Sequence, residues 1–150
     1  MDIYEYLKTD HDKVSALFKQ FKKAPAKRKA AIATLIADEL IAHAKSEQET
    51  FYRVLEQYSQ SEDEALHGWK EHEEIENQIN SFDNKAMTEK SLNTKVEKLE
   101  ELVNHHVKEE EGDIFKKAKK VITSDQSYAI KELMHDLKHQ WLLKRQRKSL

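Results

Sequence analysis

The chain has 150 residues, with 36% charged and 38% hydrophobic residues, two glycines and one proline. The scarcity of turn residues excludes a many-stranded sheet and favours long amphipathic helices, and the length fits a single domain over residues 1–150. The formal net charge is −2 with both signs interleaved, so no nucleic-acid partner is expected. The absence of cysteine excludes disulfides, thiolate zinc sites and iron–sulfur clusters.

Hydrophobic periodicity predicts an all-α fold with five helices. The expected ranges are residues 2–23, 26–58, 62–82, 88 to about 120, and 126–147. Short connections make the first four helices antiparallel neighbours, which predicts an up-down-up-down four-helix bundle. The fifth helix is expected to pack outside this bundle.

An apolar stripe with helical spacing runs along each predicted helix. The first stripe consists of Tyr4, Leu7, His11, Val14, Phe18 and Phe21. The second consists of Ile32, Ile36, Leu40, His43, Glu47, Phe51 or Thr50, and Val54. The third consists of Ala65, Trp69, His72, Ile75, Ile79 and Phe82. The fourth consists of Leu92, Val96, Leu99, Val103, His106, Glu110 and Ile114, and the fifth of Ile130, Leu133, Leu137 and Trp141.

Each of the first four stripes contains one histidine, and two of them add a glutamate one turn later. The pattern reads as a helical hairpin used twice, since His11 precedes His43 by 32 residues and His72 precedes His106 by 34. Residues four apart share a helix face. The predicted metal ligands, all directed at one interior point, are therefore His11, His43, Glu47, His72, His106 and Glu110.

Imidazole and carboxylate ligands suit iron, manganese or zinc. If both glutamates bridge two ions and each ion takes two histidines, open coordination positions remain for a small ligand. The competing interpretation is a set of core histidines satisfied by hydrogen bonds, which would have to apply at every one of these positions. Helix lengths leave about 9 Å of mismatch in depth between the first two histidines, which the turn has to absorb.

The remaining histidines are not predicted as ligands. His106, with Glu110, continues the fourth stripe, whereas His105 is rotated by about 100° and is expected to be a supporting or surface group. His67 lies off the third stripe. His135 and His139 are four apart but lie beside the apolar face of the fifth helix, so solvent exposure is expected.

At these residues the chain resembles the hemerythrin-like, or HHE cation-binding, family. The strongest segments are HAKSEQETFY at residues 43–52 and HHVKEEEGDIF at 105–115, each with an aromatic residue about nine positions after the ligand histidine. Segments TDHDKVSALF at 9–18 and KEHEEIENQI at 70–79 resemble the lone-histidine helices, so the resemblance covers about residues 2–120. It implies a non-haem di-iron centre held by the six predicted ligands.

The chain departs from the oxygen-carrying hemerythrins at two positions. Those proteins place a second histidine four residues after the one on helix three, where this chain has Glu76. They also place an aspartate five residues after the helix-four histidine, where this chain has Glu111. Glu76 is expected to face solvent or to supply an additional oxygen ligand.

The leading hypothesis is therefore a protein with two carboxylate-bridged iron ions that binds oxygen, nitric oxide or peroxide, or that handles iron, in sensing, storage or stress response. The alternatives are a redox enzyme that removes peroxide or nitric oxide, and a metal-free helical interaction module. No residue is assigned a catalytic role. Because no signal peptide or long apolar run is visible, a cytoplasmic protein without a membrane partner is expected. The oligomeric state is left open.

Overall fold

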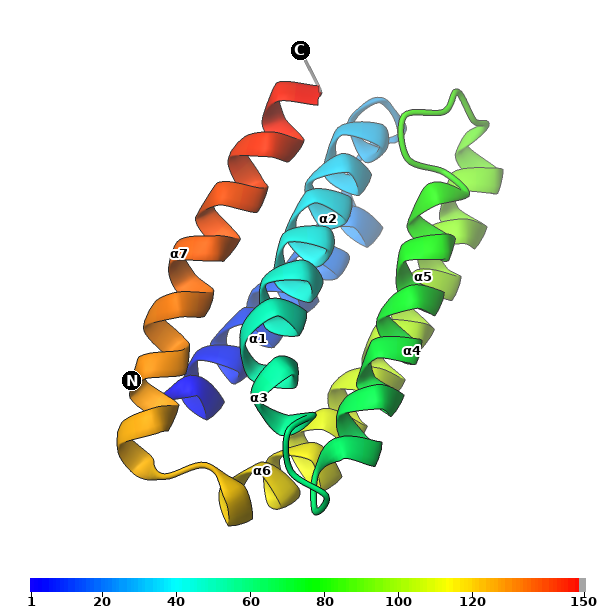
Figure 1. Cartoon of the computed structure of the whole chain (residues 1–150). Coiled ribbons are helices and arrows are strands. Elements are labelled where there is room, and N and C mark those ends of the chain that lie inside the picture. The colour runs from blue at the N-terminus through cyan, green and yellow to red at the C-terminus, as the bar shows by residue number, and fades with distance from the viewer. Residues whose placement is uncertain (149–150) are drawn as a thin grey trace.

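A computed structural model describes residues 1–148, and these residues contain helices but no strand. Figure 1 shows α1 (Ile3–Lys23), α2 (Ala26–Glu47), α4 (Glu62–Asn80) and α5 (Glu89–Glu109) as an up-and-down bundle, with α7 (Ser124–Lys148) packed along α1 and α2. The all-α prediction with an additional C-terminal helix is confirmed. Short segments continue two of the bundle helices, namely η1 (Gln48–Tyr52), α3 (Arg53–Leu55), η2 (Glu110–Ile114) and α6 (Phe115–Val121).

The helix boundaries follow from local chemistry. Asp2 accepts a hydrogen bond from the Glu5 backbone N–H, and the Glu5 carboxylate accepts one from the Asp2 backbone, which forms a capping box at the start of α1. At the start of α5, the Thr88 hydroxyl accepts a single capping hydrogen bond from the backbone N–H of Ser91. Pro25, which has no N–H to donate, stands immediately before the first turn of α2.

Two apolar clusters fill the interior, and the predicted metal ligands lie between them. On α1, Ile3 and Leu7 belong to one cluster and Val14 and Phe18 to the other, with His11 in between. The predicted ligands of α4, and those of α2 and α5 with the short segments that continue them, likewise lie between residues of the two clusters, so a polar layer crosses the bundle between two apolar regions. Water reaches such a layer only with difficulty, which strengthens electrostatic interactions within it.

The predicted stripe of the fifth helix is partly wrong. Leu133 is 59% exposed, whereas Met134 is fully buried and the inward face of α7 continues to Lys138. The physical reason is that Lys138 is buried as one member of an ion-pair network. A prediction that used apolar residues alone therefore chose the wrong face of this helix as the inward one. A similar shift occurs after η1, where Leu55 rather than Val54 is fully buried.

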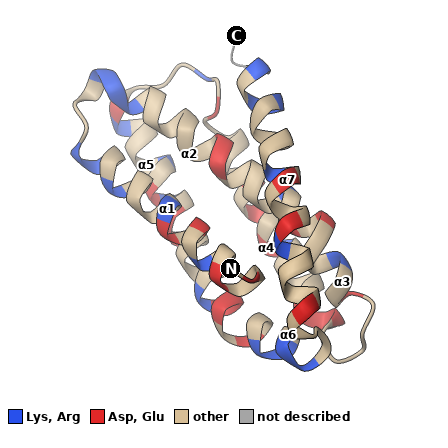
Figure 2. Ribbon diagram, turned by 90° about the vertical axis from the view of Figure 1, so that its left-hand side faces the viewer, with Lys and Arg blue, Asp and Glu red and all other residues tan. Residues whose placement is uncertain are grey.

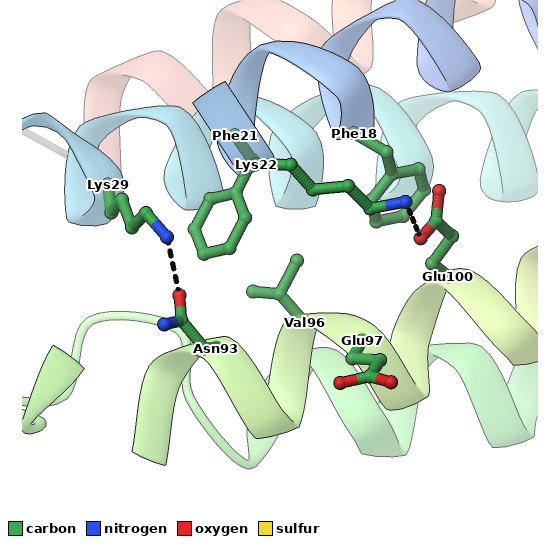
Figure 3. A pocket seen from close by; sticks show the side chains of 8 residues that line it. All are labelled: Phe18, Phe21, Lys22, Lys29, Asn93, Val96, Glu97 and Glu100. Carbon is green, nitrogen blue, oxygen red and sulfur yellow. Dashed lines mark hydrogen bonds and ion pairs between the residues drawn. The ribbon is translucent and has the colours of Figure 1, made fainter. Parts of the chain in front are cut away.

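Charged residues of both signs are distributed along the helices, and basic residues gather near the C-terminal end of α7 (Figure 2). A groove of about 330 Å³ opens beside Phe18, Phe21 and Val96, where Lys22 bonds Glu100 at 2.7 Å and Lys29 Nζ donates to an Asn93 oxygen at 2.9 Å (Figure 3). None of the predicted metal ligands lines this groove.

Within the described part of the chain, no helix is both long and apolar enough to cross a bilayer.

Candidate metal centre

The six predicted ligands are all buried and converge in the polar layer. Their ligand atoms form two groups, each with all its atoms within 4.8 Å of one another. One group consists of Glu47, His72, His106 and Glu110, and the other of His11, His43 and Glu110. Glu110 belongs to both groups, so its carboxylate occupies the position that a bridge between two ions requires.

The Nε2 atom of each of the four histidines points inward at the carboxylates. Glu110 presents Oε1 to His11 at 3.2 Å and Oε2 to His106 at 3.3 Å. Glu47 presents Oε1 to His72 at 3.1 Å and to His43 at 3.6 Å. Each glutamate therefore contacts one histidine from the α1–α2 hairpin and one from the α4–α5 hairpin. The depth mismatch expected between α1 and α2 is absorbed, because the rings of His11 and His43 lie 5.2 Å apart.

The Nδ1 atom of every one of these histidines has its own oxygen partner. The pairs are His11 with Glu111 at 2.7 Å, His43 with Asp10 at 2.8 Å, His72 with Gln48 at 2.9 Å, and His106 with Glu71 at 2.7 Å. A proton on Nδ1 that is donated outward leaves the Nε2 lone pair directed at the centre. This outer hydrogen bond is the usual support of a metal-binding imidazole, since it fixes the tautomer and the ring orientation.

Several buried atoms in this layer have no hydrogen-bond partner among the described residues. They are Nε2 of His11 and His43, both carboxylate oxygens of Glu47, and Oε1 of Glu110. Unpaired polar atoms are costly to bury, and a carboxylate more so than a neutral group. A pair of divalent cations would satisfy all of them at once. The donor set therefore fits a metal centre, and its nitrogen and oxygen ligands suit iron, manganese or zinc.

The electrostatics of the layer also favour cations. Burial opposes a charge on His43, but the hydrogen bond with Asp10 and the negative charge of the nearby Glu47 raise the pKa of His43 to about 10. Burial likewise opposes a charge on His106, and bonds with Glu110 and Glu71 raise its pKa to about 10. Protons held by these two imidazoles balance the buried glutamates, as bound cations would. Metal binding must displace such protons, which makes metal affinity dependent on pH.

Tyr52 is a further candidate residue of the centre that the stripes did not reveal. Its side chain is fully buried, its hydroxyl donates to Glu110 Oε2, and its ring stacks on His72 with the centroids 5.1 Å apart. In an α-helix, a residue nine positions after His43 would be turned by about 900°, onto the opposite face. The π-helical segment η1 begins directly after Glu47 and adds one residue to the turn, which brings Tyr52 back to the centre. The aromatic nine positions after the histidine was the available signal.

Gly68 on α4 provides the space for this tyrosine. A Cβ atom at Gly68 would lie 2.6 Å from Cζ and 2.7 Å from the hydroxyl oxygen of Tyr52. Real Cβ contacts of this length do not occur. The glycine is thus required by the close approach of the tyrosine ring to the α4 backbone.

The second H-x-x-x-E pair also ends in a π-helical segment, because η2 begins at Glu110 itself. π-Helical turns of this kind are frequent at functional sites. After the turn, Ile114 and Phe115 both lie in the apolar cluster below the centre. The two halves of the bundle therefore share this irregularity as well as the spacing of their ligands.

Lys138 of α7 joins the support of His43, which was not expected from an outer helix. Its Nζ lies 2.6 Å from Asp10 Oδ1 and 3.1 Å from Glu39 Oε2, and all three side chains are largely buried. Burial opposes ionisation of Asp10, but hydrogen bonds and charges of His43 and Lys138 hold its pKa well below the usual range. The C-terminal helix thus fixes the carboxylate that orients a predicted ligand.

The residues that were not counted among the six predicted ligands lie away from the centre. The His105 side chain is 65% exposed, whereas its neighbour His106 is buried in the centre, in agreement with the predicted register of α5. Glu76 bonds Lys45 at 3.0 Å instead of entering the centre. His135 and His139 on α7 are exposed, as predicted.

Comparisons with known proteins bear on the whole bundle. A search of curated proteins finds a DNA nickase of Nostoc sp. (strain PCC 7120 / SAG 25.82 / UTEX 2576), which is 26% identical over 130 residues, 85% of this chain. The chain spans 36% of the length of that protein. No solved structure matches significantly. The sequence model of one protein family, described as the hemerythrin HHE cation binding domain, matches residues 2–118, from α1 into α6. The chain therefore belongs to the hemerythrin HHE cation-binding family, and its buried histidine–glutamate cluster fits a metal-binding protein of that family.

Proposed function

We propose that this protein holds two iron ions in the polar layer and binds a small neutral diatomic molecule, dioxygen or nitric oxide, at them. The residues that would hold the ions are His11, His43, Glu47, His72, His106 and Glu110, and Glu110 is the glutamate that belongs to both groups of ligand atoms. Bound iron supplies open coordination positions and a change of oxidation state. Manganese and zinc are the alternative ions, because the same ligand types accept them. Residues 1–150 act as one domain in this proposal, since α7 supports the centre through Lys138.

The observation that carries the proposal is the opposite orientation of the two nitrogens in all four histidines. Each Nδ1 is bonded outward and each Nε2 faces a glutamate in the centre. A metal-free polar core would satisfy its histidines on both sides with protein groups. Here Nε2 of His11 and His43 has no hydrogen-bond partner among the described residues, which favours a metal centre over an interaction module.

A small cavity beside the histidines supports a diatomic ligand. Its volume is about 20 Å³, room for about one water-sized molecule, and it touches all four ligand histidines but neither glutamate. The other walls are apolar side chains, namely Val14, Leu40, Ala44, Ile75, Val103 and Val107. A neutral diatomic loses little hydration on entering such a space, whereas a charged ligand would lose much. Apart from the four ligand histidines, the cavity is lined by apolar side chains alone, which favours binding over turnover.

Metal analysis of protein purified without added metal or chelator tests the first part of the proposal. We expect two ions per chain, and substitution of Glu110 by alanine should reduce this number. Absence of bound metal that cannot be restored with ferrous iron would favour the interaction module. Wild-type protein that keeps one metal ion would show that only one of the two groups is a site.

Anaerobic titration of the ferrous protein with nitric oxide or dioxygen tests the second part. We expect a spectral change that saturates at a fixed ratio of ligand to metal centre. Consumption of many equivalents per centre would instead identify a redox enzyme. The Nostoc relative adds only the shared domain to this proposal, because the chain spans 36% of that protein.

A further inference from the structure

Four side chains outside the centre meet on the surface between α4 and α5. His67 and Glu71 lie one turn apart on α4, and His105 and Glu109 lie one turn apart on α5. His67 Nε2 lies 2.6 Å from Glu109 and 3.4 Å from Glu71. His105 Nε2 lies 3.1 Å from Glu109 and 3.3 Å from Glu71. The Nε2 atom of each of the two histidines therefore faces a carboxylate from each helix. We call these four residues the outer cluster.

We propose that the outer cluster is a second divalent-metal site, suited to a zinc-type ion and separate from the buried centre. Ligand atoms of His67, Glu71 and Glu109 lie within 4.8 Å of one another, and His105 adds a fourth nitrogen beside both carboxylates. Two imidazoles and two carboxylates are ligands that zinc takes in a tetrahedral arrangement, at about 2.0–2.2 Å. The histidines are more than half exposed, so a hydrated ion can reach them.

Ordinary surface ion pairing accounts for only part of this arrangement. A histidine four residues before a glutamate on one exposed helix contributes little to stability and is common. In the outer cluster, each Nε2 also meets the glutamate of the other helix. One Nε2–H donates one good hydrogen bond, so a second carboxylate beside it is better matched by a cation that all four groups share.

Glu71 connects the outer cluster to the buried centre. Its Oε1 accepts the Nδ1 proton of His106 at 2.7 Å, while its Oε2 faces the two outer histidines. A cation at Oε2 would withdraw charge from this carboxylate, which makes His106 a weaker donor toward an inner metal. The outer site itself does not depend on the proposed function; only this coupling to the inner centre does.

The test is a zinc titration of the iron-loaded protein, followed by calorimetry and metal analysis. Wild-type protein should bind one zinc ion beyond its iron, and the double variant His67→Ala/His105→Ala should bind none at that affinity. Loss of both imidazoles should exceed the roughly 10–100-fold loss typical of removing a supporting group. The matched control is His135→Ala/His139→Ala, which removes two exposed histidines of α7 and should leave the extra zinc in place.

A second titration keeps this test independent of the buried centre. In Glu110→Ala, where the inner bridge is removed, zinc should still bind at the outer cluster, and adding His67→Ala/His105→Ala should abolish that binding. Equal zinc stoichiometry and affinity with and without the outer histidines would overturn the outer site. Zinc bound there without any change in the optical spectrum of the inner iron would overturn the coupling through Glu71.

Discussion

The substitution Gly68→Ala probes the approach of Tyr52 to the metal centre with a single added methyl group. The new Cβ would lie 2.6 Å from Tyr52 Cζ. The ring cannot move aside easily, because it is fully buried, stacks on His72 and donates to Glu110. We therefore expect the substitution both to destabilise the protein and to disturb the centre.

The magnitude follows from two opposing effects. Replacement of a helical glycine by alanine stabilises a helix by about 1 kcal/mol, and overpacking of a filled core costs about 1–3 kcal/mol. Gly112 is a matched control, because a Cβ there meets nothing within 4 Å and only the helical gain applies. Gly68→Ala should thus be less stable than Gly112→Ala by about 1–3 kcal/mol. At roughly 2–4 °C per kcal/mol for this chain length, the two melting temperatures should differ by about 2–12 °C.

The assay is thermal unfolding followed by circular dichroism, together with metal content and the optical spectrum of the iron-loaded protein. In a Tyr52→Leu background the clashing ring atoms are gone, so Gly68→Ala should become neutral or stabilising. Equal melting temperatures for Gly68→Ala and Gly112→Ala would refute the packing argument. An undiminished penalty in the Tyr52→Leu background would show that a contact other than the tyrosine requires the glycine.

Three further predictions concern the centre and its support. Chelation should lower the melting temperature and ferrous iron should restore it, because metal binds the native state preferentially; Glu110→Ala should blunt the recovery and His135→Ala should not. The raised pKa values of His43 and His106, about 10 each, mean that their protonated forms stabilise the folded chelated protein. This contribution is complete below pH of about 6.5 and is lost as pH rises toward about 10. The melting temperature of the chelated protein should therefore fall between pH 7 and pH 9.5, and the melting temperature of the metal-loaded protein should change less. Lys138→Met should cost about 3–5 kcal/mol in urea unfolding, because it leaves buried carboxylates uncompensated.

Each of these outcomes has a contrary result. An unchanged melting temperature when bound metal content changes would disconnect the centre from folding. Chelated protein that becomes more stable between pH 7 and 9.5 would contradict the protonation assigned to the two histidines. Lys98→Met is the control for the buried lysine, since the ion pair of Lys98 with Glu101 is mostly exposed and should contribute only about 0–1 kcal/mol. Equal losses for both lysine variants would show that Lys138 has no special role.

The burial of the six predicted ligands in one polar layer was predictable, because their positions obey a simple periodicity. His43 with Glu47 and His106 with Glu110 continue apolar stripes, and residues four apart necessarily share a helix face. The choice of His106 over His105 followed from the same periodicity, because His106 continues the apolar stripe of its helix and His105 does not. Tyr52 was not predicted, because a π-helical turn breaks the 3.6-residue period directly after Glu47.

The order of apolar and polar residues was enough to predict the helices, their antiparallel order and the inward direction of the six predicted ligands, since these depend on local hydrophobic periodicity and short connections. Packing between helices determined which oxygen supports each histidine, because it brings Asp10, Gln48, Glu71 and Glu111 to the four imidazoles. It also decided the burial of Lys138, where pairing with two carboxylates overrides the ordinary preference of a lysine for solvent. Local sequence patterns determine which side chains point inward, and contacts between distant segments determine their hydrogen-bond and ion-pair partners.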